Sequence, residues 1–151
     1  MTPTLTYIAD FAVEVGAPIA VGDTGQGLRH VVPILGGKVG GPRLRGTILP
    51  GGADVQIIQP DGYSRLEARY VIRLVDDTLV QVVNSGIRSG PPDVMARITR
   101  GESVDPGLVY FRTVPRFESA ASSYQWLTRQ LFVASGARHP NLVEIKVFEV
   151  G

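Results

Sequence analysis

Residues 36–62, GGKVGGPRLRGTILPGGADVQIIQPDG, decide the fold, because glycine-containing clusters alternate there with short apolar runs. Glycine adopts turn conformations that other residues avoid, so the pattern predicts strands joined by tight turns. Asp54 follows a glycine pair and precedes an apolar run, which places a carboxylate where the backbone can approach closely. The stretch has no nucleotide, metal or nucleophile motif, so it indicates an all-β class without indicating a reaction.

The two-residue apolar period continues on both sides of this stretch. We expect strands at residues 5–15, 28–35, 43–49, 53–59, 63–75, 79–85, 108–113, 131–134 and 142–150. A proline pair and a closing glycine predict a short helix over 91–100, and a helical turn fits 122–129. Most connections are short and rich in Gly, Pro and Asp, so neighbouring strands should be antiparallel. Residues 16–27 read as a flexible lid or connector.

So many antiparallel strands with little helix must close or stack to protect their edges, and we favour a closed or nearly closed β-barrel. A length of 151 residues without internal repeats indicates one domain over 1–151. The formal net charge of +1 lacks the basic excess that nucleic-acid binding requires. No segment is apolar enough to span a membrane and no export signal opens the chain, so we expect a cytoplasmic protein.

Several short motifs occur in one order over nearly the whole chain, and together they resemble domain-of-unknown-function family 3237 of bacteria and fungi. The motifs are Gly36-Gly37, Gly51-Gly52-Ala53-Asp54, Asp61-Gly62, Ala68-Arg69-Tyr70, Tyr110-Phe111-Arg112-Thr113, Tyr124, Trp126-Leu127 and Phe148-Glu149-Val150. The resemblance implies a compact β-barrel of this size and implies little about function. This chain carries Val55 where the family often has Trp, a change that we expect to alter the size of any pocket there.

Asp54 is the first candidate catalytic residue. Its carboxyl group could act as a general base or acid if burial raised its pKa, or it could cap a turn by accepting backbone N–H bonds. Asp61, within Pro-Asp-Gly, reads as a turn residue. On residues 63–75 the apolar and charged side chains alternate, so Arg69 either faces solvent or lines a wet cavity and pairs with Asp54.

The other candidates are arginines and aromatic residues. Arg29 and His30 are neighbours on a strand and must face opposite ways, so either Arg29 binds an anionic ligand inside or His30 is an interior acid–base group. Arg112 either extends outward or pairs inside with an acid. Tyr124 and Trp126 either fill the base of the barrel or form an aromatic wall for a planar ligand.

These residues predict a small-molecule-binding barrel whose chemistry is proton transfer of the isomerase, cyclase or dehydratase type. The predicted catalytic residues are Asp54, Arg112 and Tyr70, and the predicted ligand-binding residues are Arg29, Arg69, Tyr124 and Trp126. A non-catalytic carrier or sensor, or a structural oligomerisation module, is the alternative function.

No cofactor is indicated, and two histidines without metal-ligand spacing predict no metal site. The expected partner is a small organic acid or an aromatic or polyketide-like compound. A homodimer is also compatible with the pattern, because small barrels often pair through exposed strand faces.

Overall fold

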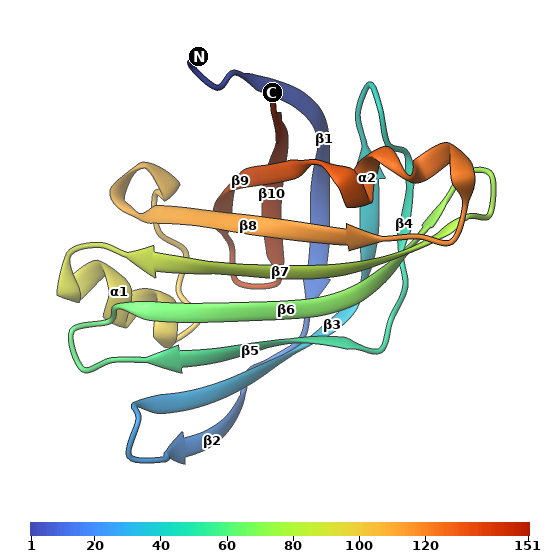
Figure 1. The fold of residues 1–151 in the computed structure, drawn as a ribbon. Helices are drawn as coiled ribbons and strands as arrows, with labels where there is room; N and C mark the ends of the chain where they lie inside the picture. The colour runs from blue at the N-terminus through green and yellow to red at the C-terminus, as the bar shows by residue number, and fades with distance from the viewer.

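The computed structural model, which describes residues 1–151, confirms the predicted all-β barrel (Figure 1). The strands are β1 (Leu5–Val15), β2 (Ile19–Asp23), β3 (Leu28–Gly40), β4 (Gly46–Ile48), β5 (Gly52–Ile58), β6 (Ser64–Leu74), β7 (Leu79–Ser89), β8 (Tyr110–Glu118), β9 (Leu131–Arg138) and β10 (Leu142–Val150). The helices are α1 (Pro92–Thr99) and α2 (Trp126–Arg129), with 3-10 turns η1 (Pro106–Leu108) and η2 (Ser122–Tyr124).

The sheet closes because β1 pairs with β10 on one side and with β3 on the other, and all pairings are antiparallel. Between β3 and β6, β4 and β5 follow one another along the same side, each pairing with both neighbours. The ring therefore has eight strand positions, while β2 pairs with β3 alone. An eight-stranded barrel is just wide enough for side chains to fill it or to hold one small ligand.

The two ends of the chain meet at one point of the ring. Thr4 and Gly151 exchange both backbone hydrogen bonds, at 2.9 and 2.8 Å, and thereby extend the β1–β10 pairing to the last residue. Figure 1 shows the N and C labels side by side above β1 and β10. The termini are thus part of the barrel's hydrogen-bonded wall.

Two differences from the sequence expectation concern residues 16–37. The predicted flexible lid over 16–27 contains β2, whose apolar residues Ile19 and Val21 are exposed. The Gly36-Gly37 pair, expected to be a turn, lies within β3, where both glycines have positive φ angles. A Cβ added at Gly37 would meet the carbonyl oxygen of Ala12 on β1. This glycine therefore permits the close approach of two strands at the point where the barrel closes.

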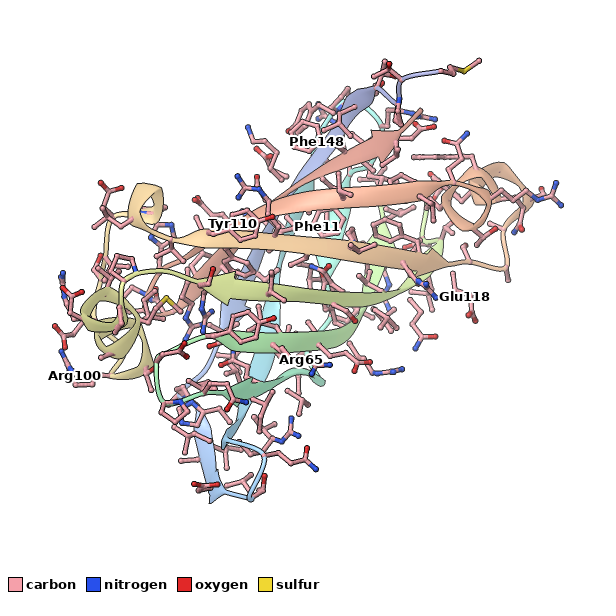
Figure 2. All side chains as sticks on the ribbon, turned by 60° about the vertical axis from the view of Figure 1, so that its left-hand side comes forward. Phe11, Arg65, Arg100, Tyr110, Glu118 and Phe148 are labelled. Atoms are coloured by element: carbon pink, nitrogen blue, oxygen red, sulfur yellow. The ribbon has the colours of Figure 1, made fainter.

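The core fills most of the barrel interior, and three of its phenylalanine rings form one cluster. Phe117 packs edge-on against Phe11 and Phe132, with ring centroids 6.1 and 5.1 Å apart. Figure 1 shows α1 and α2 at opposite ends of β6, β7 and β8. Under α1, Val94, Met95, Ile98 and Val104 form a separate small apolar cluster. In Figure 2, Tyr110 and Glu118 mark the two ends of β8, and Arg100 lies beside α1.

Candidate functional site in the barrel interior

Polar side chains enter the barrel interior from four neighbouring strands. Asp54 of β5 pairs in register with Ala68 of β6, and Ala68 pairs with Asn84 of β7. Because these residues are directly opposite one another, their side chains lie on the same inner face of the sheet. Thr113 of β8 and Tyr70 of β6 are buried on that face as well. The small Ala68 side chain leaves space between its two polar neighbours.

These side chains surround an interior cavity of about 40 Å³. Its polar lining residues are Asp54, Tyr70, Asn84 and Thr113, and the rest of the lining is apolar, from Val13, Val15, Ile34, Leu66, Ala68, Phe111, Val143 and Ile145. One water molecule needs roughly 10–15 Å³ of such space, so the cavity accommodates a group of about three heavy atoms. The site is therefore small, largely apolar and provided with a few polar groups.

Five buried polar atoms at this site have no hydrogen-bond partner within the protein. They are Asp54 Oδ1, Tyr70 OH, Asn84 Oδ1, Arg88 Nε and Thr113 Oγ1. Buried polar atoms are paired in the large majority of cases, because leaving one unpaired costs about 1–3 kcal/mol. Four of these atoms belong to residues that line one cavity, which is the arrangement expected where an external group completes the hydrogen bonds.

The carboxyl group of Asp54 is held in place by one hydrogen bond, which its Oδ2 accepts from Gln56 Nε2 at 2.8 Å. Burial raises the pKa of Asp54 above its ordinary value, and the hydrogen bond from Gln56 and the positive charges of Arg88 and Arg138 oppose only part of this rise. A carboxyl group in this environment exchanges a proton more readily near neutral pH than an exposed one.

The raised pKa of Asp54 makes the stability of the fold depend on pH. The folded pKa lies above the unfolded one, so the stability associated with the protonated carboxyl is complete below the unfolded pKa. That stability is lost as the pH rises through the folded pKa. Asp54→Asn removes this titration. The free energy of unfolding of the variant, measured in urea, should therefore increase relative to that of the wild type as the pH rises from 4 to 8. Asp10→Asn, at an exposed position, is the control; an equal gain for both variants contradicts the prediction.

Two arginines and a histidine lie next to the cavity. Arg88 of β7 is only 3% exposed, its guanidinium carbon lies 5.6 Å from the centroid of the Phe111 ring, and burial lowers its pKa to about 10. Burial also lowers the pKa of Arg138 on β9. His30 is buried, and burial together with the charge of Arg88 lowers its pKa, which favours a neutral imidazole. Arg88 therefore stays cationic at neutral pH in a nearly dry environment.

The structure brings together two of the three predicted catalytic residues, Asp54 and Tyr70. Burial raises the pKa of the Tyr70 phenol, and the nearby charge of Asp54 raises it further, so its proton is retained. Arg112, the third, lies on the outer face of β8, where its Nη1 donates to the carbonyl of Phe111 and its guanidinium carbon lies 5.1 Å from the centroid of the Tyr110 ring. Of the two arrangements open for Arg112, the structure has the outward one, because Phe111 and Thr113 occupy the inward positions.

The predicted ligand-binding arginines also lie outside the barrel. Arg69 is exposed and pairs with Glu67 at 2.7 Å on the outer face of β6, so of its two predicted arrangements the structure has the solvent-facing one, without a pairing to Asp54. Arg29 is half-buried and its Nη1 donates to the carbonyl of Gln56 at 3.3 Å, while His30 takes the inward position. Of the two arrangements open for this pair, the structure has the interior histidine.

Tyr124 and Trp126 lie at the α2 end of the barrel and do not line the cavity. Tyr124 OH donates to Asp76 Oδ2 at 3.0 Å. Trp126 packs against Phe132, with ring centroids 6.0 Å apart, and the Arg43 guanidinium carbon lies 3.8 Å from its ring centroid. Of the two arrangements predicted for these residues, the structure has the one in which they pack against the core at the barrel base, away from this cavity. Val55 also faces outward and is 38% exposed, so it does not set the size of the interior cavity.

Sequence reasoning missed Asn84, Arg88 and Thr113 as site residues. The predicted strand ended at residue 85, so Arg88 fell outside it, whereas β7 continues to Ser89. The alternation that buries Val80, Val82 and Asn84 reaches Arg88 after two more steps of two residues, and this was the signal available. An arginine that points into the barrel is an exception to the rule that charged side chains face solvent. The two-residue alternation alone therefore did not indicate that Arg88 is buried.

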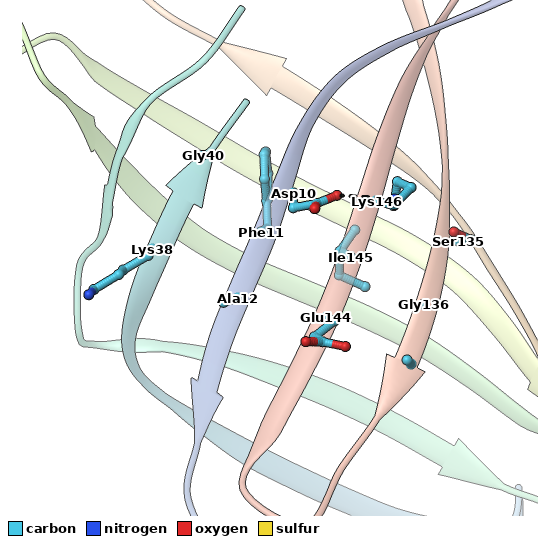
Figure 3. Close-up of a pocket in the computed structure, with 11 residues that line it drawn as sticks. Asp10, Phe11, Ala12, Lys38, Gly40, Ser135, Gly136, Glu144, Ile145 and Lys146 are labelled. Carbon is cyan, nitrogen blue, oxygen red and sulfur yellow. Dashed lines mark ion pairs between the residues drawn. The ribbon is translucent and has the colours of Figure 1, made fainter. Parts of the chain in front are cut away.

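The outer surface carries three larger hollows. One, of about 470 Å³, lies over β1, β3, β9 and β10; Figure 3 shows Lys38 there pointing away from the other labelled side chains, and Asp10 and Lys146 approach to 3.9 Å. The second, of about 660 Å³, is largely apolar and includes Tyr110, Arg112 and Val114, and the third, of about 400 Å³, lies beside α1. The charged side chains in all three hollows are exposed, unlike Asp54 and Arg88, so the interior cavity is the better candidate site. The expected homodimer through exposed strand faces stays a prediction.

The fold and its polar interior define this chain as a closed antiparallel β-barrel protein. It belongs to the family described as protein of unknown function (DUF3237), whose sequence model matches residues 3–150, and this confirms the resemblance seen in the sequence. A UPF0311 protein of Rhodopseudomonas palustris is 46% identical over 152 residues, which cover 99% of each chain. No helix of the structure is long and apolar enough to cross a membrane.

Solved structures share the whole fold. A conserved protein of unknown function from Rhodopseudomonas palustris superposes with a TM-score of 0.96 at 44% identity, covering 100% of this chain and 99% of that one. A β-barrel-like protein from Acinetobacter baumannii has a TM-score of 0.88 at 30% identity, covering 100% and 98%. An enzyme from Penicillium herquei has a TM-score of 0.70 at 17% identity, covering 97% and 96%, a likeness that concerns the fold alone.

Proposed function

We propose that the barrel binds a small organic molecule at its interior cavity and moves a proton on it, as an isomerase, cyclase or dehydratase does. The proposed ligands are a small organic acid or an aromatic or polyketide-like compound. The observation that supports this most is the convergence of unpaired buried polar atoms from Asp54, Tyr70, Asn84 and Thr113 on one cavity. A barrel used only as scaffold has no need for this arrangement, which lowers its stability.

Asp54 is the proposed acid–base group. In its ionised form the free Oδ1 accepts a proton from a carbon next to a carbonyl group of the ligand; the electron pair of that C–H bond forms a C=C bond, and the π pair of the carbonyl moves to its oxygen. The protonated carboxyl then returns the proton to another position, which completes an isomerisation without net gain or loss of atoms. The raised pKa of Asp54 suits both directions of transfer near neutral pH.

Tyr70 is proposed to stabilise the charge that forms on the carbonyl oxygen. The Tyr70 hydroxyl keeps its proton and has no acceptor within the protein, so it can donate to that oxygen. The buried Arg88 adds a positive charge near Asp54, in an environment where electrostatic interactions are strong.

Deuterium exchange into simple carbonyl compounds tests this function while the natural substrate is unidentified. The protein is incubated in D₂O with a panel of enolisable compounds, such as acetoacetate, acetylacetone and 2-oxo acids, and loss of the C–H signal is followed by proton NMR. We expect exchange above the buffer rate for at least one compound that also shifts amide signals around the cavity. Binding without exchange supports the carrier alternative, and neither binding nor exchange across the panel contradicts the proposal.

A further inference from the structure

Two buried or half-buried cations share the interior with a single acid. Arg88 extends inward from β7 and Arg138 extends from β9, on either side of β8. Neither arginine makes a direct ion pair, although the chain's other charged residues form six. Asp54 influences both from a distance beyond direct contact. The interior therefore holds more positive than negative charge.

Phe111 connects the two arginines in space. The Arg88 guanidinium carbon lies 5.6 Å from the centroid of the Phe111 ring. On the other side, a Cβ at Gly136 would meet the same ring, so the glycine makes room for it two residues before Arg138 on β9. Phe111 also lines the interior cavity together with Asp54, Asn84 and Thr113. Arg88 thus lies beside Phe111, which lines the cavity, and Arg138 lies with Phe111, Ile98 and Val104 on the side of α1.

A buried cation without an ion-pair partner is costly, because the lost hydration is not replaced by an opposite charge. Asp54 compensates for this incompletely, since its own burial favours the neutral carboxyl. The remaining positive charge can be neutralised by an anionic group of the ligand. The planar guanidinium fork matches the two oxygens of a carboxylate, and the cavity accommodates about three heavy atoms, the size of one carboxylate group.

We propose that the interior site recognises the carboxylate of a small organic acid through Arg88, whose free Nε and full burial make it the principal ligand, with Arg138 adding positive charge. This inference rests on the proposed function in taking the interior cavity as the ligand site. It narrows the substrate class to carboxylic acids and assigns their recognition to two residues separate from Asp54. The carboxylate is held at the α1 end, and the rest of the ligand extends from there.

Acetate and its neutral isostere acetamide are the probes for this inference. Titrations at constant ionic strength are followed by two-dimensional amide NMR of the wild-type protein. Acetate should bind saturably with a Kd on the order of 1 mM, which is within the range open to so few atoms, and should shift the signals of Gly86, Thr113 and the Asn84 side chain. Acetamide should bind at least about tenfold more weakly, because it lacks the charge.

Variants locate the interaction. Arg88→Gln should weaken acetate binding by about tenfold or more, and Arg138→Gln by a smaller factor, since Arg138 is only partly buried. Arg65→Gln, on the outer face of β6 and labelled in Figure 2, is the matched control and should bind acetate like the wild type. Should Arg88→Gln fail to fold, Arg88→Lys keeps the charge without the fork and should still weaken binding.

The outcomes separate this inference from the proposed function. Equal binding of acetate and acetamide at the cavity, with no effect of Arg88→Gln, overturns carboxylate recognition and leaves the cavity as a ligand site. Failure of both probes to shift any cavity signal contradicts both the inference and the proposed function. Preference for acetate that is lost in Arg88→Gln and kept in Arg65→Gln supports the inference.

Discussion

Replacing Asp54 by asparagine should lower the rate of deuterium exchange into a responsive ligand by about 10²–10⁴-fold, which is the usual contribution of a positioned acid–base group. Asparagine has nearly the same shape and can keep a hydrogen bond with Gln56, but it cannot accept and return a proton. Exchange rates are measured by proton NMR at pH 7 and compared at saturating ligand, so that a change in affinity does not enter the result.

Two controls make this result specific. Glu67→Gln changes an exposed carboxylate on β6, one strand away from Asp54, and should leave the exchange rate unchanged. The folded state of Asp54→Asn is checked by its unfolding curve, which should show equal or greater stability than the wild type at pH 8. An Asp54→Asn variant that is folded and still exchanges within about threefold of the wild-type rate would exclude Asp54 as the acid–base group.

Alanine at position 37 should destabilise the barrel by about 2–6 kcal/mol, measured by urea unfolding with Trp126 fluorescence as the probe. Gly37 has a φ of 145°, which a side chain disfavours at a cost of about 1–3 kcal/mol. The added methyl group would also meet the carbonyl oxygen of Ala12, and such overpacking costs about 1–3 kcal/mol more. This clash can be relieved only if β1 and β3 move apart at the seam, the β1–β3 pairing that closes the barrel.

Substitutions at two other glycines separate the cost of the positive φ angle from the cost of the close contact. Gly51 has a φ of 108° with nothing within 4 Å of an added Cβ, so Gly51→Ala should show the conformational cost alone. Gly40 lies on the same strand as Gly37 and also has open space, so Gly40→Ala should change stability by less than about 1 kcal/mol. If Gly37→Ala costs no more than Gly51→Ala, the close approach of β1 and β3 does not constrain the seam.

The sequence predicted the barrel well because strand alternation and turn residues are local signals. The alternation in residues 63–75 places Leu66, Tyr70 and Ile72 inside, as the structure confirms. Glycine misled the prediction only at Gly36 and Gly37, because the same conformational freedom serves a turn and a close approach between strands. Which of these applies depends on a partner strand more than twenty residues away in the chain.

The site was harder to predict because a two-residue period tells which side chains share a face and leaves open which face is inside. In Tyr110-Phe111-Arg112-Thr113 both faces carry an aromatic ring, so the pattern did not place Arg112. Arg29 and His30 posed the same question. The structure answers it through register, since His30 lies opposite Gln56, two residues from Asp54, on the inner face of β5. An interior cation such as Arg88 can be recognised only after it is known which face of its strand points into the barrel.

The meeting of the two chain ends has a consequence for how the barrel can be made. Because Thr4 and Gly151 already exchange backbone hydrogen bonds, a short linker could join them, and new termini could open in the turn at residues 139–141 between β9 and β10. Such a circular permutant keeps every strand neighbour and moves the free ends from the top of β1 to the opposite rim. The architecture is thus a ring whose starting point along the polypeptide is arbitrary.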